Sequence, residues 1–275
     1  MGFFGMFNFD KPGKGIDPDA PEKRGFFLFF DIFIRKFWRI VTLSLSYTLL
    51  CVPVFFIYFA MTTFLQNAFS PIKDPQFITY MGTYLTLFLL CFLGAGPASA
   101  GQAYVLRNFS RETHAWVWDD FVSHAKENIK QGSLMFLLDL IIIPLLVSAA
   151  SLYLMHGGTM PLPPVITMAF GFFAVFLLFI YLMMHFFVYP LMVTLDMKFG
   201  MLLKTAMQLT LLKLPQCLLI FVIAGVVFAA FLALYFVNVA FILLFGALGF
   251  SLVTFVYVFY AMRVIDEMLE EQNRL

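Results

Sequence analysis

Charged residues are scarce in this sequence, and their scarcity excludes most soluble folds. Lys, Arg, Asp and Glu make up 12% of the 275 residues and hydrophobic residues 62%, against roughly 25% charged in a soluble domain. A water-soluble core cannot hold such an excess, so we expect the apolar residues to face lipid. The formal net charge is +1, which provides no strong positive field, so we expect no nucleic-acid partner.

The motifs of soluble enzymes and metal sites are also missing. The chain has no GxSxG, no HExxH, no GxxxxGK(S/T) and no GxGxxG after a strand. Cys51, Cys91 and Cys217 lie inside apolar runs without the spacing of zinc or haem ligands, so we expect them to pack as small hydrophobic residues. We therefore expect a protein that is not an enzyme and that uses no cofactor and no metal.

Long apolar runs are what the sequence does have. A helix needs about 20 apolar residues to cross the hydrocarbon core. Six stretches reach that length, and the last two come from dividing the uncharged run between Lys213 and Arg263 at a turn near residues 235–238. The six predicted spans are residues 40–65, 78–106, 133–154, 165–191, 215–236 and 239–262.

The distribution of basic residues predicts the orientation of these spans. Short cytoplasmic loops collect Lys and Arg, and 16 of the 17 basic residues fall on one side of the alternating six-span arrangement. The sequence thus predicts an all-α, polytopic transmembrane bundle with both termini in the cytoplasm. Its parts are a cytoplasmic N-terminal segment (residues 1–39), a membrane domain (residues 40–262) and a cytoplasmic C-terminal tail (residues 263–275).

Three segments outside the spans have the pattern of helices that lie flat on the cytoplasmic surface of the membrane. In residues 23–39, Asp31, Arg35 and Arg39 recur every four residues and form a polar line, while phenylalanines fill the rest of the helix. We expect similar interfacial helices at residues 111–131 and 197–213. Basic and aromatic residues of the first two segments and their borders form a predicted partner surface: Arg35, Arg39, Arg107, Arg111, Trp116 and Trp118.

Two ionisable residues, Asp139 and His185, lie inside predicted spans, where such residues are costly and are candidates for function. As a pair they would bind or relay a proton. Counted inward from the external loop, however, they differ in depth by about 9 Å at 1.5 Å per residue. This difference favours a structural role, in which Asp139 reaches the inner interface or meets a basic residue there.

Small residues interrupt the second predicted span. Gly94, Gly96 and Gly101 have the spacing that lets another helix approach the backbone closely. Pro97 removes an amide donor and favours a break in the helix, as in transporters that expose backbone groups to a substrate. Close packing is the favoured interpretation, and a substrate or partner contact is the alternative.

Two stretches of the chain resemble the YesL-like family of bacterial membrane proteins. They are GFFGMFNFDKPGKGIDPDAPEKRGFFLFFDIFIRKFWRI near the start and GPASAGQAYVLRNFSRETHAWVWDDF after the second span. The family has no settled biochemical activity, and its genes commonly lie beside those for carbohydrate ABC importers. The resemblance therefore implies a multi-pass protein of the bacterial cell membrane, but it carries no catalytic residue over.

From this resemblance we expect a non-enzymatic accessory or scaffold subunit of a carbohydrate ABC importer. Its partners would be the lipid bilayer and the permease subunits, and a homo-oligomer stays open. The alternative is a small-solute transporter or channel that uses the broken second span and Asp139.

Overall fold

The computed structural model describes residues 25–51, 96–155 and 163–274, and within these ranges the regular elements are helices without a strand. The predicted all-α class is confirmed. The longer elements are α1 (Phe26–Arg35), a helix at Phe37–Cys51, α4 (Pro97–Ser110), α5 (Val117–Glu127), α6 (Ile129–Met155), α7 (Pro164–Thr194), α8 (Phe199–Leu212), α9 (Leu214–Val237) and α11 (Phe250–Arg274). Three short elements join α9 to α11: η3 (Val239–Phe241), α10 (Ile242–Leu244) and the π-helix η4 (Phe245–Gly249).

Among the described residues, four helices are long and apolar enough to cross a membrane: Ile129–Leu154, Pro164–Thr194, Leu214–Leu234 and Phe245–Glu271. They coincide with the third to sixth predicted spans. The first two predicted spans are described only in part, because residues 52–95 lie outside the described ranges. At the other end of the chain, α11 continues as one helix to Arg274, through the segment that the sequence led us to expect as a tail.

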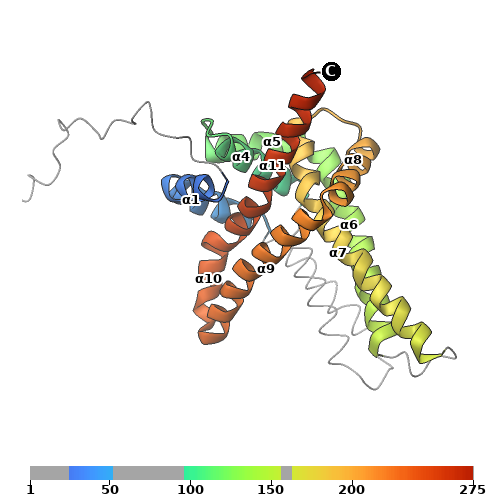
Figure 1. Cartoon of the computed structure of the whole chain (residues 1–275). Coiled ribbons are helices and arrows are strands. Elements are labelled where there is room, and N and C mark those ends of the chain that lie inside the picture. The colour runs from blue at the N-terminus through green and yellow to red at the C-terminus, as the bar shows by residue number, and fades with distance from the viewer. Residues whose placement is uncertain (1–24, 52–95, 156–162, 275) are drawn as a thin grey trace, which may run out of the picture.

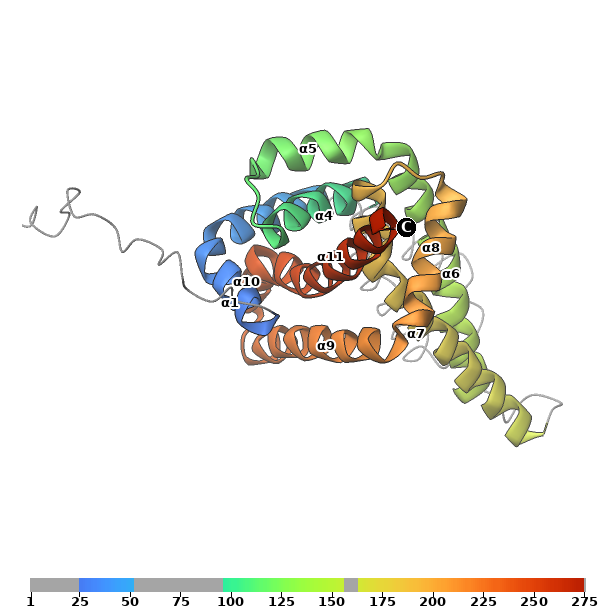
Figure 2. The same cartoon turned by 45° about the horizontal axis from the view of Figure 1, so that its top comes forward.

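The helices form two antiparallel pairs that diverge from a common end. Figure 1 shows the pair α6–α7 running down one side and α9 with α11 running down the other. The short helices α1, α4, α5 and α8 gather at the upper end, where the C-terminus also lies. In Figure 2, α4 lies between α5 and α11, so a helix of only 14 residues occupies the centre of this end.

Helix α4 is the centre of the packing although its composition is not strongly apolar. It contacts α1, α5, α6, α7 and α11, and ten of its 14 residues are buried. Small side chains allow α4 to pack at the centre, because the Ala, Ser and Gly residues in its first half let neighbouring helices approach its backbone closely. Pro97 stands in the first turn, where its missing amide hydrogen costs nothing, and Gly96 before it has φ +55°.

Glycines set how close α4 comes to its neighbours. A Cβ atom built on Gly96 would lie 2.6 Å from the carbonyl oxygen of Gly132 in α6, and one on Gly132 would lie 2.7 Å from the Pro97 nitrogen. A Cβ on Gly101 would overlap the carbonyl oxygen of Phe121 in α5. At Gly96 and Gly101 the backbones of neighbouring helices lie in close contact, and the helix begins at Pro97 instead of running through it. Gly94 lies outside the described residues.

Two buried hydrogen bonds tie α4 to helices far away in the sequence. The hydroxyls of Tyr47 and Ser99 lie 3.1 Å apart, and Gln102 Nε2 donates to Ser251 Oγ of α11 over 3.0 Å. Each such bond contributes about 1 kcal/mol, and an unpaired buried partner costs more. The polar residues of α4 therefore specify which helices it contacts, and its small residues set the distance.

The prediction for this packing is that Gly101→Ala destabilises the fold. The added methyl group collides with the α5 backbone, which cannot rotate away as a side chain can, so we expect a loss of about 1–3 kcal/mol. Gly225→Ala in α9 is the matched control, since a Cβ there meets no atom within 4 Å. Thermal unfolding in mild detergent measures both variants, and equal midpoints would contradict the proposed contact.

Candidate functional site

Asp139 of α6 and His185 of α7 form a buried pair. His185 Nε2 lies 2.9 Å from Asp139 Oδ1, and each residue is 1% exposed. The structural role that we favoured from the sequence had Asp139 meeting a basic residue or reaching the interface. The structure instead gives it His185 as its ion-pair partner within the described residues.

The expected depth difference between the two residues is wrong, and the helix register explains why. A Cβ on Gly171 would contact Leu154. These residues therefore lie opposite each other, near the end of α6 and the start of α7. Leu154 lies 15 residues after Asp139, and Gly171 lies 14 residues before His185, so equal helix lengths bring the pair together. The loop count failed because α7 begins at Pro164 and extends beyond the end of α6.

Tyr181 completes the site, and the sequence analysis missed it. Its hydroxyl donates to Asp139 Oδ1 over 2.6 Å, and His185 Nδ1 lies 3.0 Å from the Tyr181 carbonyl oxygen. Asp139 Oδ2 is buried and has no hydrogen-bond partner among the described residues. The available signal was the spacing of four between Tyr181, His185 and Tyr189, which places three polar groups on one face of α7.

At Gly96 and Gly101, the small-residue stretch packs against α6 and α5. Gly96, Pro97 and Gly101 contact α5 and α6 as described above, and Gly94 lies outside the described residues. Gly96 and Gly101 are therefore close-packing residues among those that the structure describes. No cluster of three His, Cys, Asp or Glu residues suited to a metal ion occurs in the part of the chain that the structure describes.

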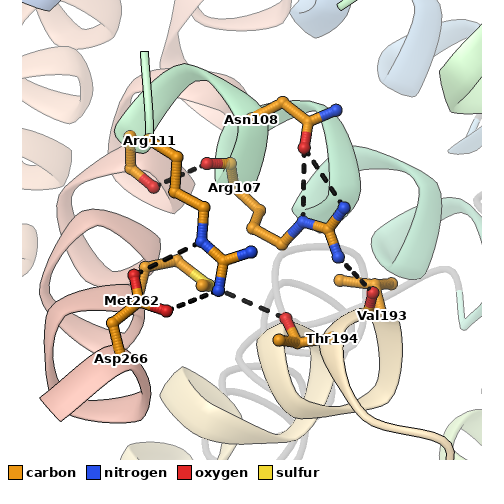
Figure 3. A network of polar contacts seen from close by, with 8 residues as sticks. Arg107, Asn108, Arg111, Val193, Thr194, Met262 and Asp266 are labelled. Carbon is orange, nitrogen blue, oxygen red and sulfur yellow. Dashed lines mark hydrogen bonds and ion pairs between the residues drawn. The ribbon is translucent and has the colours of Figure 1, made fainter. Parts of the chain in front are cut away.

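Arg107 is turned inward, contrary to its expected place on a partner surface. Figure 3 shows its side chain reaching from α4 to the end of α7, where Nη1 donates to the Val193 carbonyl oxygen over 2.5 Å. Nε and Nη2 both lie near Asn108 Oδ1, at 3.3 and 3.2 Å. Burial lowers the pKa of Arg107, but a guanidinium stays charged in proteins. Arg107 therefore joins α4 to the end of a membrane-length helix.

Arg111 and Arg35 are paired with acidic residues of other helices. Arg111 binds Asp266 of α11 with both carboxylate oxygens in reach, as Figure 3 shows. Arg35 of α1 lies 3.1 Å from Glu112 and 3.8 Å from Asp31. Because these groups are partly exposed, each pair contributes little stability alone. Together they hold α1, α4 and α11 in register.

The turn after α4 has an unusual residue at its tightest position. Glu112 has φ +57°, where a glycine normally follows a helix. The amide of Glu112 donates to Phe109 O, and that of Thr113 donates to Asn108 O. This helix-ending motif directs Glu112 toward Arg35 and presents the Thr113 carbonyl oxygen to Lys36 Nζ, 3.1 Å away. The contacts with Arg35 and Lys36 offset the strain of the positive φ at Glu112.

Lys36 also lies over the ring of Phe109, with Nζ 4.7 Å from the ring centroid. Burial lowers its pKa below the usual value, and the positive charges of Arg35 and Arg39 act in the same direction. The break between α1 and the next helix occurs at this residue. The bend thus places a basic side chain on the end of α4.

Five of the six predicted surface residues are exposed, and two of these five, Arg35 and Arg111, are the ion-paired arginines. Trp116 is 68% exposed and Trp118 is 51% exposed. Arg39 is also exposed, but it lies on a different helix. Trp116 stands just before α5, where its amide donates to Asp120 over 2.8 Å. This hydrogen bond holds the start of α5, where both tryptophans are exposed.

No family model, curated protein or solved structure matches this chain. The site must therefore be interpreted from its own geometry.

Proposed function

We propose that this chain is a YesL-like protein of the bacterial cell membrane with six spans and both termini in the cytoplasm. Four membrane-length helices and the position of the basic residues support this arrangement. The helices at residues 26–35, 117–127 and 199–212 correspond to the predicted interfacial segments. In the proposed topology these helices, with the ion-paired end of α4 and α11, face the cytoplasm.

The protein is proposed to act as a non-enzymatic accessory subunit of a carbohydrate ABC importer. The observation that carries this proposal is the exposed pair Trp116 and Trp118 on a braced end of the molecule. Tryptophans are common among residues that dominate binding energy at protein interfaces. A rigid platform lowers the entropy lost on docking, and the close backbone contact between α4 and α5 at Gly101 holds the helix that carries these tryptophans.

A small-solute transporter is the second candidate, and the buried Asp139–His185 pair favours it. Ionisable residues inside membrane helices often mark ion or substrate paths, and Asp139 Oδ2 has no partner among the described residues. The broken segment at Pro97 no longer supports this candidate, because its glycines pack against α5 and α6.

The first prediction concerns topology. In a variant in which Cys51, Cys91 and Cys217 are replaced by Ser, a single cysteine at Lys198 reacts with a membrane-impermeant thiol reagent only after the cells are permeabilised. A single cysteine at Asn238 reacts in intact cells. Both positions are exposed, so access depends on the side of the membrane. Labelling of the Asn238→Cys variant only after permeabilisation would overturn the six-span arrangement.

The second prediction concerns the partner. Purification of the full chain from its native membranes in mild detergent recovers importer permease subunits, identified by mass spectrometry. The Trp116→Ala, Trp118→Ala double variant loses most of that recovery, because two aromatic anchors are removed. Trp38→Ala is the matched control, since Trp38 is 77% exposed but lies on another helix. Absence of any importer subunit with the wild-type chain contradicts the accessory function.

A further inference from the structure

Hydrogen-bond directions around His185 determine where its first proton lies. His185 Nδ1 is 3.0 Å from the carbonyl oxygen of Tyr181. A carbonyl oxygen can only accept a hydrogen bond, so Nδ1 must carry a hydrogen and donate it. The ring is therefore either the Nδ1–H tautomer or the doubly protonated imidazolium.

A second proton must lie between His185 and Asp139. Nε2 and Asp139 Oδ1 are 2.9 Å apart, and an unprotonated Nε2 facing a carboxylate oxygen would bring two lone pairs together. The hydroxyl of Tyr181 already donates to the same oxygen over 2.6 Å. One proton is therefore shared, as an imidazolium beside a carboxylate or as a neutral imidazole beside a carboxylic acid. Both arrangements have the same protons and a net charge of zero.

Loss of this shared proton would leave one negative charge in a site that is 1% exposed. A buried charge is unfavourable, but the hydrogen bond that Tyr181 donates to Asp139 Oδ1 offsets part of that cost, so the pair favours its protonated form and can still release the proton. The titratable neighbours are Tyr181 and Tyr189 of α7 and Tyr257 of α11, which acts electrostatically on Tyr189. Neutral phenols donate hydrogen bonds but supply no positive charge. Among the described residues, only His185 forms an ion pair with Asp139.

We propose that Asp139 and His185 form a binding site for a single exchangeable proton, with Asp139 Oδ2 as the position at which the proton enters and leaves. The buried Oδ2 atom is an acceptor with no partner among the described residues, as is required of a position that receives a donor from outside the pair. On uptake, a proton leaves a water-derived donor and bonds to the pair, whose charge changes from −1 to zero. This inference does not depend on the accessory function, and each can fail alone.

Asp139→Asn is the variant that separates a proton site from a structural contact. The asparagine amide has two N–H donors, one for His185 Nε2 and one for the Tyr181 oxygen, while His185 Nδ1–H keeps the Tyr181 carbonyl oxygen. The contacts with His185 and Tyr181 are then retained, but the side chain at position 139 has no carboxyl group that can gain or lose a proton. We therefore expect this variant to fold, and Asp196→Asn, which changes an exposed carboxylate, is its control.

The test is nitrogen NMR of ¹⁵N-histidine-labelled full chain in detergent micelles, titrated from about pH 5 to about pH 10, a range that brackets ordinary histidine and phenol titration. The histidine signal that differs between wild type and Asp139→Asn belongs to His185. We expect wild-type His185 to hold Nδ1–H throughout and to lose one proton from the shared position within this range. In Asp139→Asn, His185 is expected to stay the neutral Nδ1–H tautomer at every pH, while Asp196→Asn behaves as wild type.

Two results would overturn the proposal. One is a wild-type pair that keeps its shared proton across the whole range, which makes it a permanent structural contact. The other is the same His185 titration in wild type and Asp139→Asn, which shows that the carboxylate does not hold the proton. If Asp139→Asn does not fold, the double variant Asp139→Asn, His185→Gln replaces it, because it has neither titratable group of the pair: proton release by wild type, measured with a pH indicator in weakly buffered micelles, then exceeds that of the double variant by one proton per chain, and equal release contradicts the site.

Discussion

The close approach of α4 to α5 and α6 is the constraint on which the rest of this structure depends. It requires glycine at Gly96, Gly101 and Gly132, because a Cβ at each position would meet backbone atoms of a neighbouring helix. A short helix can then be buried among its neighbours, which include the long helices α6, α7 and α11, and its hydrogen bonds to Tyr47 and Ser251 help to select those neighbours. In lipid, where apolar burial does not drive helix association, such contacts decide the arrangement.

The charged end of α4 and the buried pair of α6 and α7 are consequences of this packing. Arg107 reaches the Val193 carbonyl oxygen because α4 lies against the end of α7. The same α7 carries His185 about two helical turns earlier in the chain, where α6 supplies Asp139. The contact of Arg107 at the end of α7 and the proposed proton site thus share one helix.

Composition and apolar run length sufficed for the helical class and for α6, α7 and α9, since these follow from local residue type. The alignment of α6 with α7 was not predictable. The positions of Asp139 and His185 were counted from the loop between the helices, and α7 extends beyond the end of α6 there. Arg107 was assigned to a surface because a charge pattern does not say which way a long side chain turns. Tyr181 was missed because a tyrosine in an apolar run resembles one that faces lipid.

Hydrogen exchange of the α4 backbone tests the central claim most directly. Amide exchange reports local opening, and α4 has no membrane-spanning length to protect it by itself. Measured by mass spectrometry on the full chain in mild detergent, the amides of residues 99–109 should exchange as slowly as those of α7 and α11 that pack against them. Exchange of α4 as fast as that of the surface helix α5 would contradict the claim that α4 organises the fold.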